Sequence, residues 1–400
     1  MRVLILATDV YTRGGIARYT RTLADTLGCL VGPENVDVLP LLGGTGPAFT
    51  PAHYRILEPT TNALTLRTKF QHIARVLGHS WRGYDLMICG HLSLTPVAAV
   101  AKACHGKPYL VACYGAEAWC PFRLPLKVGV QSADLALPIS QFTRDKLHKV
   151  NDVPLDKLKL LYVAVPDEFA CLLTGVKSTP ASSPRLDGER ILLSVGNLGK
   201  AHRYKGFDTV IQALPGVLEA VPDLLYVIVG EGDDRTYLEG LAAKIGVARH
   251  VTFAGSLSDT DLAAYYHACD AFVLPSRALR HIGHWDGEGF GIVYIEAALA
   301  GKPVVGSFGG GAAEAVLHGR TGLLVEPGSV KEVMDAVVTL LTNQDLASRM
   351  GCEGRRWASQ NFTTCSLRRS LQILLGPYGL RRQGSGDRHH SGPLAPVLQQ

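Results

Sequence analysis

The stretch EGFGIVYIE, residues 288–296, runs directly into AALAGKPVV, residues 297–305. This pattern predicts a glycine-rich turn that opens a helix, followed by a strand, which is a repeating unit of parallel α/β folds. The glycines let the backbone approach a ligand, and the first free N–H groups of the helix favour a diphosphate. Glu288 lies in the turn, and Glu296 lies two helical turns later on nearly the same side. We therefore expect a turn that binds a nucleotide sugar, with one glutamate at the sugar and the other at the ribose.

The composition limits the classes of protein to which the chain can belong. Four hundred residues exceed one typical core, so two domains are expected. The 40 basic and 35 acidic side chains leave a net charge of +5, too mild a bias to predict nucleic-acid binding. Nine cysteines without a Cys-x-x-Cys pair predict reduced thiols in a cytoplasmic protein rather than a disulfide framework or a zinc site. No Gly-x-Gly-x-x-Gly motif follows the first strand, and we expect no cofactor.

Short apolar runs alternate with helix-compatible stretches in two series. They lie at residues 3–7, 36–41, 85–89, 108–113 and 134–138, and again at 190–195, 224–229, 250–254, 270–275, 303–307 and 322–325. The alternation predicts an α/β protein with two Rossmann-like, doubly wound parallel-sheet domains that face each other across a cleft. In such sheets ligands bind beyond the carboxyl ends of the strands.

A segment rich in small residues and proline, 175–184, is the best candidate for a linker between the domains. The segment after residue 380 has too little apolar content to fold alone. The expected divisions are an N-terminal acceptor-binding domain over 1–172, a linker over 173–188, a nucleotide-sugar-binding domain over 189–358, a helix over 359–378 that packs back toward the N-terminal domain, and a disordered tail over 379–400.

Two turns at expected strand ends of the first domain carry candidate contacts. Gly14 and Gly15 follow the first strand, where they can face a phosphate or simply form a tight turn. Glu117 follows the strand at 108–113 and can contact donor or acceptor. The alternative for Glu117 is a helix-starting carboxylate beside a packing tryptophan, Trp119.

Three cations, Lys200, Arg203 and Lys205, follow the first strand of the second series. At the carboxyl end of a strand, such side chains can neutralise a pyrophosphate leaving group. A solvated basic loop is the alternative, but the glycine-rich turn with Glu288 in the same expected domain favours a functional role.

Two groups of residues could be interpreted as metal ligands. Asp259 and Asp261 have the spacing of a metal-binding carboxylate pair, but carboxylates are favoured at a helix N-terminus without any metal. His281, His284 and Asp286 look like a ligand cluster, yet no further ligand has convincing spacing. We interpret the segment with His281, His284 and Asp286 as a flexible loop that shapes the sugar or acceptor pocket, and we expect no metal at either group.

A set of motifs in the second half comes in a characteristic order and spacing. The motifs are SVGNL (194–198), RYKGFD (203–208), VGEG (229–232), FAG (253–255), LPS (274–276), EGFGIVYIE (288–296) and GGGAAEAV (309–316), preceded in the first half by GGI (14–16) and PISQFT (138–143). This combination resembles the retaining glycosyltransferases of the large family numbered four, which have the GT-B architecture. The resemblance covers most of the chain and is most specific in the second half.

The resemblance implies a reaction and a set of contacts. A hexose would move from a nucleoside diphosphate sugar, with GDP-mannose and UDP-glucose as leading candidates, to an acceptor hydroxyl with retention at the anomeric carbon. No metal would be needed, and the donor phosphate would act as base. Glu288 would contact the sugar hydroxyls and Glu296 the ribose, and Lys205, with Arg203, would stabilise the departing diphosphate. The expected donor-binding residues are Gly15, Asn197, Gly255, Phe290, Gly291, Ile292 and Glu296, and those of the acceptor or sugar pocket are Tyr114, Glu117 and His284.

Two positions depart from the pattern of the family. Many relatives carry an arginine where Asn197 stands and a histidine where Tyr114 stands, so a cation and an imidazole donor are lost. Arg203 or Lys200 can replace the cation, and a phenol retains some hydrogen-bonding capacity. Two alternatives to a transferase stay open: a nucleotide-sugar epimerase of the same architecture and a non-catalytic sugar-nucleotide-binding subunit.

The expected acceptor is a sugar, a lipid-linked compound or a small molecule, in the synthesis of a polysaccharide, a glycolipid or a glycosylated metabolite. The stretch 69–77 predicts a helix with Phe70, Ile73 and Leu77 on one face and basic residues elsewhere. It can touch an anionic membrane or be an ordinary helix with a solvated basic face. We therefore expect a cytoplasmic protein, with contact to the inner face of the membrane as an option.

Overall fold

The computed structural model describes residues 1–380 except 13, 45–50, 52, 64, 82, 176–189 and 282–283, and it leaves out the side chain of residue 66. The chain forms two compact units, Met1–Ala164 with Thr364–Gln400 and Val165–Thr363. Most of the linker expected at 173–188, and nearly all of the tail expected at 379–400, lies outside the described residues.

The first unit is built on a parallel sheet in which the strands follow the order β3-β2-β1-β4-β5-β6. The strands are β1 (Val3–Ala7), β2 (Val36–Pro40), β3 (Arg55–Ile56), β4 (Leu86–Cys89), β5 (Tyr109–Cys113) and β6 (Leu135–Pro138). The helices are α1 (Gly15–Val31), α2 (Leu66–Ser80), α3 (Thr95–His105), α4 (Leu124–Ser132), α5 (Gln141–Asn151) and α14 (Thr364–Leu375). The central strand β1 is buried along its whole length, which is why it reads as an unbroken apolar run.

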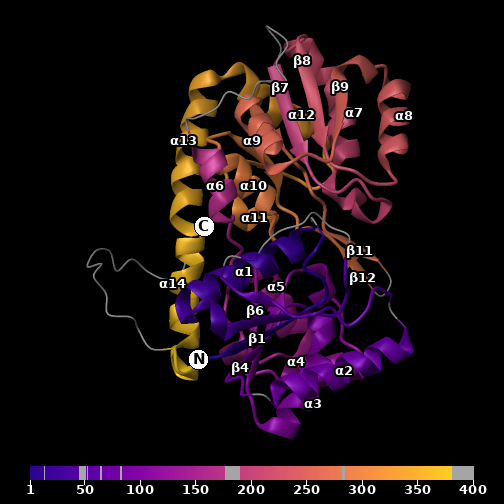
Figure 1. Ribbon diagram of the computed structural model, residues 1–400. Helices are drawn as coiled ribbons and strands as arrows, with labels where there is room; N and C mark the ends of the chain where they lie inside the picture. Colours follow the sequence, from indigo (N-terminus) through magenta and orange to yellow (C-terminus); the bar gives the residue numbers. More distant parts are fainter. Residues whose placement is uncertain are drawn as a thin grey trace, which may run out of the picture. The chain divides into compact units, whose positions relative to one another are not determined.

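The second unit repeats this topology, with strand order β14-β13-β10-β7-β8-β9. The strands are β7 (Arg190–Val195), β8 (Leu224–Val229), β9 (Val251–Gly255), β10 (Ala271–Val273), β13 (Val304–Ser307) and β14 (Gly322–Val325). The helices are α6 (Asp167–Thr174), α7 (Phe207–Ala220), α8 (Arg235–Ile245), α9 (Asp259–Ala268), α10 (Ile292–Leu299), α11 (Ala312–Ala315), α12 (Val330–Thr342) and α13 (Gln344–Asn361). Helices α7 and α8 lie on one side of strands β7, β8 and β9, and α6, α9 and α10 lie on the other (Figure 1).

Both sheets therefore have the doubly wound arrangement expected from the sequence. In each, the strand order reverses between the first and the fourth strand, β1 and β4 in the first unit and β7 and β10 in the second. Ligands of such sheets bind beyond the carboxyl ends of the strands at this switch point. The prediction of two Rossmann-like domains is confirmed.

The two units divide at positions other than the expected boundaries. Helix α6, which falls within the expected N-terminal domain, belongs to the second unit, where it packs against α9 and α10 and buries Phe169 and Leu173. Helix α14, in contrast, lies within the helix expected over 359–378 and packs against α1 in the first unit, as predicted. The apolar side chains of these short helices, rather than the position of the proline-rich segment, decide to which unit they belong.

A short antiparallel hairpin, β11 (Leu279–His281) and β12 (His284–Asp286), precedes the turn that opens α10. We expected a flexible loop here, so the pairing of these strands is a correction. Among the described residues, no helix is both long and apolar enough to cross a membrane.

Candidate functional site

Two chain segments leave the second sheet side by side at its switch point. One follows β7 and forms a 3₁₀ turn over Lys200–Lys205, and the other follows β10. The backbone N–H of Arg277, in the second segment, donates to the carbonyl oxygen of Tyr204 at 2.6 Å. The turn Lys200–Lys205, called the basic segment below, thus lies where ligands of doubly wound sheets bind.

Lys205 and Glu288 meet at this edge of the sheet. Lys205 Nζ lies 2.7 Å from Glu288 Oε2, and both side chains are largely buried, with 12% and 15% exposed. The structure therefore brings together two of the three residues expected to act in catalysis. Partial burial strengthens this charge pair relative to one at the surface.

The turn that opens α10 requires glycine at position 291. Gly291 has φ +85°, and an added Cβ would lie 2.3 Å from the ring of Tyr294 and 3.2 Å from Glu288 Cγ. Tyr294 is fully buried and donates to the carbonyl oxygen of Leu274 at 2.6 Å. The ring that excludes a side chain at residue 291 is thus fixed to the end of β10, which positions the backbone N–H groups at the start of α10.

The side chains next to Gly291 differ in their exposure. Phe290 is buried and packs against Phe362, with ring centroids 5.2 Å apart. Ile292, the first residue of α10, is half-buried. A contact of Phe290 with a ligand would therefore have to use its backbone.

Lys205 Nζ lies 5.5 Å from the ring centre of Tyr204, and that ring contacts the imidazole of His202. Burial, and then the negative charges of Glu288 and Asp286, raise the pKa of Tyr204 well above its ordinary value, so the phenol stays protonated. Burial and the positive charge of Lys205 lower the pKa of His202, which favours the neutral imidazole. The site therefore offers a phenol O–H and a neutral imidazole beside one ammonium and one carboxylate.

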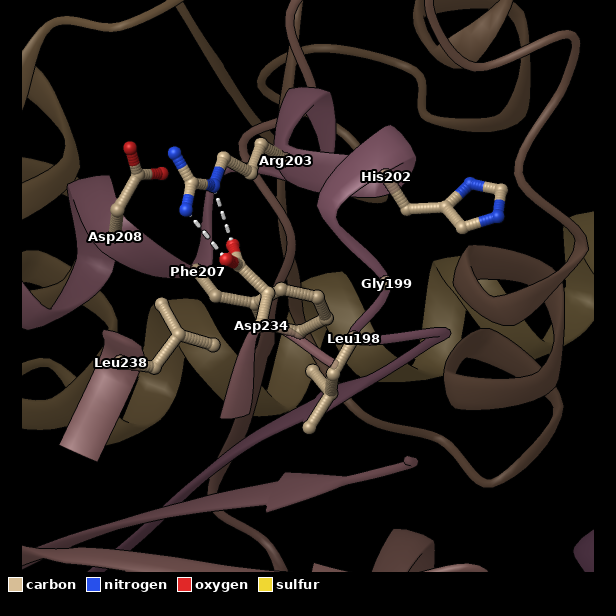
Figure 2. A pocket seen from close by; sticks show the side chains of 8 residues that line it. All are labelled: Leu198, Gly199, His202, Arg203, Phe207, Asp208, Asp234 and Leu238. Atoms are coloured by element: carbon tan, nitrogen blue, oxygen red, sulfur yellow. Dashed lines mark hydrogen bonds and ion pairs between the residues drawn. The ribbon is translucent and has the colours of Figure 1, made fainter. Parts of the chain in front are cut away.

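Arg203 lies in a different environment from the one expected. Its Nε and Nη2 atoms donate to the two carboxylate oxygens of Asp234 at 2.6 and 2.5 Å, and its guanidinium stacks 4.2 Å from the ring centre of Tyr237. Figure 2 shows Arg203 pointing toward Asp234, whereas His202 points away from it. The small pocket in this view is lined by Leu198, Gly199, His202, Arg203, Phe207, Asp208, Asp234 and Leu238, and its lining includes neither Lys205 nor Glu288.

The sequence did not single out Arg277, the residue after the LPS motif. Its guanidinium forms an ion pair with Asp208 at 3.0 Å, and it also donates to the backbone carbonyl of Arg203. This pair ties the segment after β10 to the start of α7. Its position just beyond a strand end at the switch point was the signal available in the sequence.

Glu296 is buried, with 3% of its surface exposed, and its Oε2 atom accepts a hydrogen bond from the Tyr266 hydroxyl at 2.8 Å. We expected this carboxylate to contact the ribose of a donor, and the structure shows it on a tyrosine of α9. The sequence held no signal for this partner, because Tyr266 lies 30 positions away in a different helix.

Two other predicted donor contacts belong to the loops after β7 and β9. Asn197 is exposed, and its Oδ1 atom accepts from the backbone N–H of Gly199 at 2.7 Å, which shapes the turn after β7. Gly255 has φ +72°, and its carbonyl oxygen accepts from the N–H of Gly230 at 2.9 Å. Both residues lie at carboxyl ends of strands, on loops other than those that carry Lys205 and Glu288.

In the first unit, Gly15 opens α1, and a Cβ added there would meet no atom within 4 Å. Nothing in the fold itself therefore demands glycine at this position. Tyr114 follows β5 and is buried against the edge of Tyr19, with centroids 5.8 Å apart. Glu117 turns back to accept from the N–H of Tyr114 at 2.6 Å.

His91, which the sequence did not single out, lies beside Tyr114 at the switch point of the first sheet. The two rings stack with their centroids 6.5 Å apart. Burial lowers the pKa of His91, while the charge of Glu117 acts in the opposite direction. An imidazole is thus present next to the position at which many relatives carry a histidine.

The two suspected metal groups behave differently. Ser258 caps α9, with its Oγ atom accepting from the N–H of Asp261 at 3.1 Å and donating to its carboxylate at 2.6 Å. Asp261 therefore belongs to a helix cap, as expected. His281, His284 and Asp286 converge instead, with their ligand atoms all within 4.8 Å of one another.

The segment with this geometry matches a known protein family. Residues 177–357 match the model of the family described as glycosyl transferases group 1. The match spans the basic segment, the hairpin and the turn of α10, and it confirms the resemblance inferred from the motifs.

Curated relatives match part of the chain. A GDP-mannose-dependent alpha-(1-6)-phosphatidylinositol monomannoside mannosyltransferase of Mycobacterium tuberculosis is 42% identical over 171 residues, which cover 43% of this chain and 44% of that protein. The glycogen synthase of the same organism is 37% identical over 182 residues, covering 46% of this chain and 41% of that protein. The chain thus matches less than half the length of these relatives.

Solved structures extend the likeness in fold beyond the group 1 region. The Anabaena protein HepE in complex with UDP has a TM-score of 0.77 at 21% identity, over 94% of this chain and all of that one. Sucrose-phosphate synthase from Thermosynechococcus elongatus has a TM-score of 0.76 at 20% identity, over 94% of this chain and 99% of that one. These neighbours show that the fold is GT-B.

Proposed function

We propose that the protein is a retaining glycosyltransferase that moves a hexose from a nucleoside diphosphate sugar to an acceptor hydroxyl. The observation that carries the proposal is the 2.7 Å pair of Lys205 and Glu288 beside the glycine turn of α10. A developing diphosphate needs positive charge at this position, and the ammonium and the helix N-terminus can both supply it.

The donor belongs, on this proposal, to the GDP-mannose or UDP-glucose type. The support is that curated relatives of part of this chain are described as GDP-mannose-dependent, and that HepE is described in complex with UDP-glucose. The donor diphosphate binds the N–H groups of residues 290–292 and Lys205, and the sugar hydroxyls donate to the carboxylate of Glu288. Because Lys205 and Glu288 pair with each other in the protein alone, the diphosphate takes over the ammonium when the donor binds.

Transfer proceeds with retention and without a metal at the reacting centre. The bond between the anomeric carbon and the phosphate oxygen breaks, and the acceptor oxygen bonds to the same face of the sugar. The acceptor proton passes to the departing phosphate oxygen, so no enzyme carboxylate acts as a nucleophile. Lys205 supplies the charge that a metal would otherwise bring, and Asp261 serves a helix cap.

The experiment compares Glu288→Gln with Glu239→Gln. Glu239 forms an equally short pair with Arg235 at 2.7 Å on the exposed surface of α8, which makes it a matched control. A thermal-shift titration with nucleoside diphosphates first selects the donor, because a bound ligand raises apparent stability. Nucleoside diphosphate release is then measured with a panel of sugar, lipid-linked and small-molecule acceptors. We expect Glu288→Gln to lower kcat/KM by about 10²-fold or more and Glu239→Gln to leave it unchanged.

The same assay separates the proposal from its alternatives. Unchanged turnover in Glu288→Gln would show that the catalytic assignment is wrong. If NMR shows that the donor sugar is converted to an epimer in the absence of an acceptor, the protein is an epimerase. Donor binding without turnover under any acceptor would identify a sugar-nucleotide-binding subunit.

We also propose that α2 of the first unit contacts an anionic membrane carrying a lipid-linked acceptor. Phe70 and Trp81 are 63% and 75% exposed, and their separation of eleven residues places them on one side of the helix axis. Arg67 and Lys69 are exposed near the start of the same helix. Exposed aromatic and basic side chains on one helix are typical of interfacial binding.

Vesicle flotation tests this contact. Phe70→Ser combined with Trp81→Ser should abolish flotation with anionic phosphatidylglycerol vesicles, whereas Leu155→Ser, which alters another exposed apolar residue of the same unit, should not. Equal flotation of the wild type with anionic and neutral vesicles, or no flotation at all, would contradict the proposal.

A further inference from the structure

We propose that the β11–β12 hairpin binds a divalent transition metal ion of the Zn²⁺ class through His281, His284 and Asp286. The proposal concerns a site separate from the donor contacts, and it holds or fails independently of the transfer reaction.

The backbone register alone places the three residues on one face of the hairpin. His281 lies directly opposite His284, and Leu279 lies opposite Asp286. Side chains of directly opposed residues share a face, and residues two positions apart on a strand do so as well. Arg280 pairs with Trp285 and belongs to the opposite face, so its positive charge does not occupy the histidine side.

The side-chain geometry fits one ion. The Nε2 atoms of His281 and His284 lie 3.2 and 3.8 Å from Asp286 Oδ2, and the two imidazole rings stack at 4.6 Å with 12° between their planes. A tetrahedral Zn²⁺ with bonds of about 2.0–2.1 Å holds its ligand atoms about 3.3 Å apart. The two distances from Asp286 are close to this spacing, and the stacked imidazole rings must rotate for both nitrogens to reach one ion, with the fourth position open to water.

The ligand types also favour this class of metal. Imidazole nitrogens combined with one carboxylate select Zn²⁺ and its neighbours in the first transition row over Mg²⁺ or Ca²⁺, which prefer oxygen ligands. Within the part of the chain that the structure describes, no second group of three such ligands converges.

The position of the hairpin suggests what an ion would do. Strand β12 packs against the basic turn Lys200–Lys205, and Asp286 lies two residues before Glu288. The charge of Asp286 also contributes to the raised pKa of Tyr204, which places the two groups near each other. A bound ion would join the two strands of the hairpin and stiffen the segment that leads into the α10 turn.

The test measures metal binding directly. All titrations use the full chain with His389 and His390 replaced by alanine, so that these two consecutive histidines contribute no metal binding. Isothermal titration with ZnCl₂ should give one ion per chain, and CoCl₂ should give the visible absorption of a four-coordinate ion. His281→Ala, His284→Ala and Asp286→Asn should each weaken binding at least tenfold.

The control is His53→Ala. His53 Nδ1 lies 3.8 Å from Asp25 Oδ1, so it reproduces one histidine–carboxylate pair without a second histidine, and its replacement should leave the titration unchanged. Circular dichroism checks that every variant folds. An absence of stoichiometric binding in the parent chain, binding that survives His284→Ala, or loss of binding in His53→Ala would overturn the proposal.

Discussion

Lys205 and Glu288 lie 83 positions apart in the chain, yet they form the most buried ammonium–carboxylate contact in the basic segment. Glu288 is therefore neutralised by a neighbour in the protein alone. We infer that a donor diphosphate competes for Lys205 and frees the Glu288 carboxylate for sugar hydroxyls. The pair thus couples diphosphate binding to sugar recognition.

Two glycines that were predicted to bind the donor should respond differently to substitution. Gly291→Ala places a methyl group at a positive φ and into the ring of Tyr294, so we expect a loss of about 1–3 kcal/mol of unfolding free energy. Gly15→Ala meets no atom, so the fold should keep its stability while donor affinity falls if the backbone approaches the ligand. Denaturant unfolding and donor titration check both. Unchanged donor affinity in Gly15→Ala would remove residue 15 from the site.

Lys205→Met and Arg203→Met separate a catalytic cation from a structural one. Lys205→Met should lower kcat/KM by about 10²-fold because it removes charge from the leaving diphosphate. Arg203→Met leaves the buried carboxylate of Asp234 unpaired and should lower the free energy of unfolding by about 1–2 kcal/mol. This loss is smaller than for a fully buried pair because solvent screens the half-exposed arginine. Its kcat/KM should stay within tenfold of wild type. Equal losses of kcat/KM in the two variants would return Arg203 to the catalytic set.

At the scale of elements, helix α2 differs from the expectation in the burial of two side chains, His72 and Phe70. The basic residues of this helix were expected away from its apolar face. His72 is nevertheless buried, and its Nδ1 atom lies 2.8 Å from Thr60 Oγ1. Phe70, expected on the apolar face, is exposed. Helical spacing predicts which residues share a face, but packing against the neighbouring loop decides which face is covered.

The burial of His72 predicts a dependence of stability on pH. Burial, with a smaller contribution from Arg75, lowers the pKa of His72 from 6.5 to about 4. Above pH 6.5 the imidazole is neutral in both the folded and the unfolded chain. Between pH 6.5 and 4 only the unfolded chain binds the proton, so the free energy of unfolding should fall by about 3 kcal/mol as the pH drops.

Chemical denaturation at pH 7, 5.5 and 4 measures this effect. His72→Gln removes the titrating group and should flatten the pH dependence, whereas His53→Gln, at an exposed site, should retain it. A wild-type pH profile that His72→Gln leaves unaltered would contradict the assignment.

The β11–β12 hairpin is the element that was hardest to predict from the sequence. Its strands are three residues each and their apolar pattern is weak, so a loop was the expectation. The strands of the two sheets were easier to predict, because burial on both faces makes them continuous apolar runs.

At the scale of the whole molecule, the last described helix belongs to the first unit although the chain reaches it from the second. Leu367, Leu371 and Leu375 of α14 are buried, and the helix packs against α1. This return links the termini of the described chain within one unit.

Matched substitutions in α14 test this packing. Leu371→Ala should lower the unfolding free energy of the first unit by about 2–4 kcal/mol, because it removes a buried side chain and leaves a cavity. Ile373→Ala, at a position that is 46% exposed on the same helix, should cost much less. Hydrogen exchange of the amides of β1 and α1 reports on the unit. Similar protection in the two variants would show that α14 does not stabilise it.

The sequence alone determined the two series of strands, the glycine turn of α10 and the kinds of charge gathered near it, because burial periodicity and glycine requirements are local properties. Tertiary structure decided the partners: Glu288 for Lys205, Asp234 for Arg203 and Tyr266 for Glu296. It also decided that α6 packs with the second unit, although the boundary expected near residue 173 places most of this helix in the first. These outcomes depend on parallel strands that bring residues distant in the chain to one sheet edge. Several like charges compete there, and only the distances between side chains select the pair that forms.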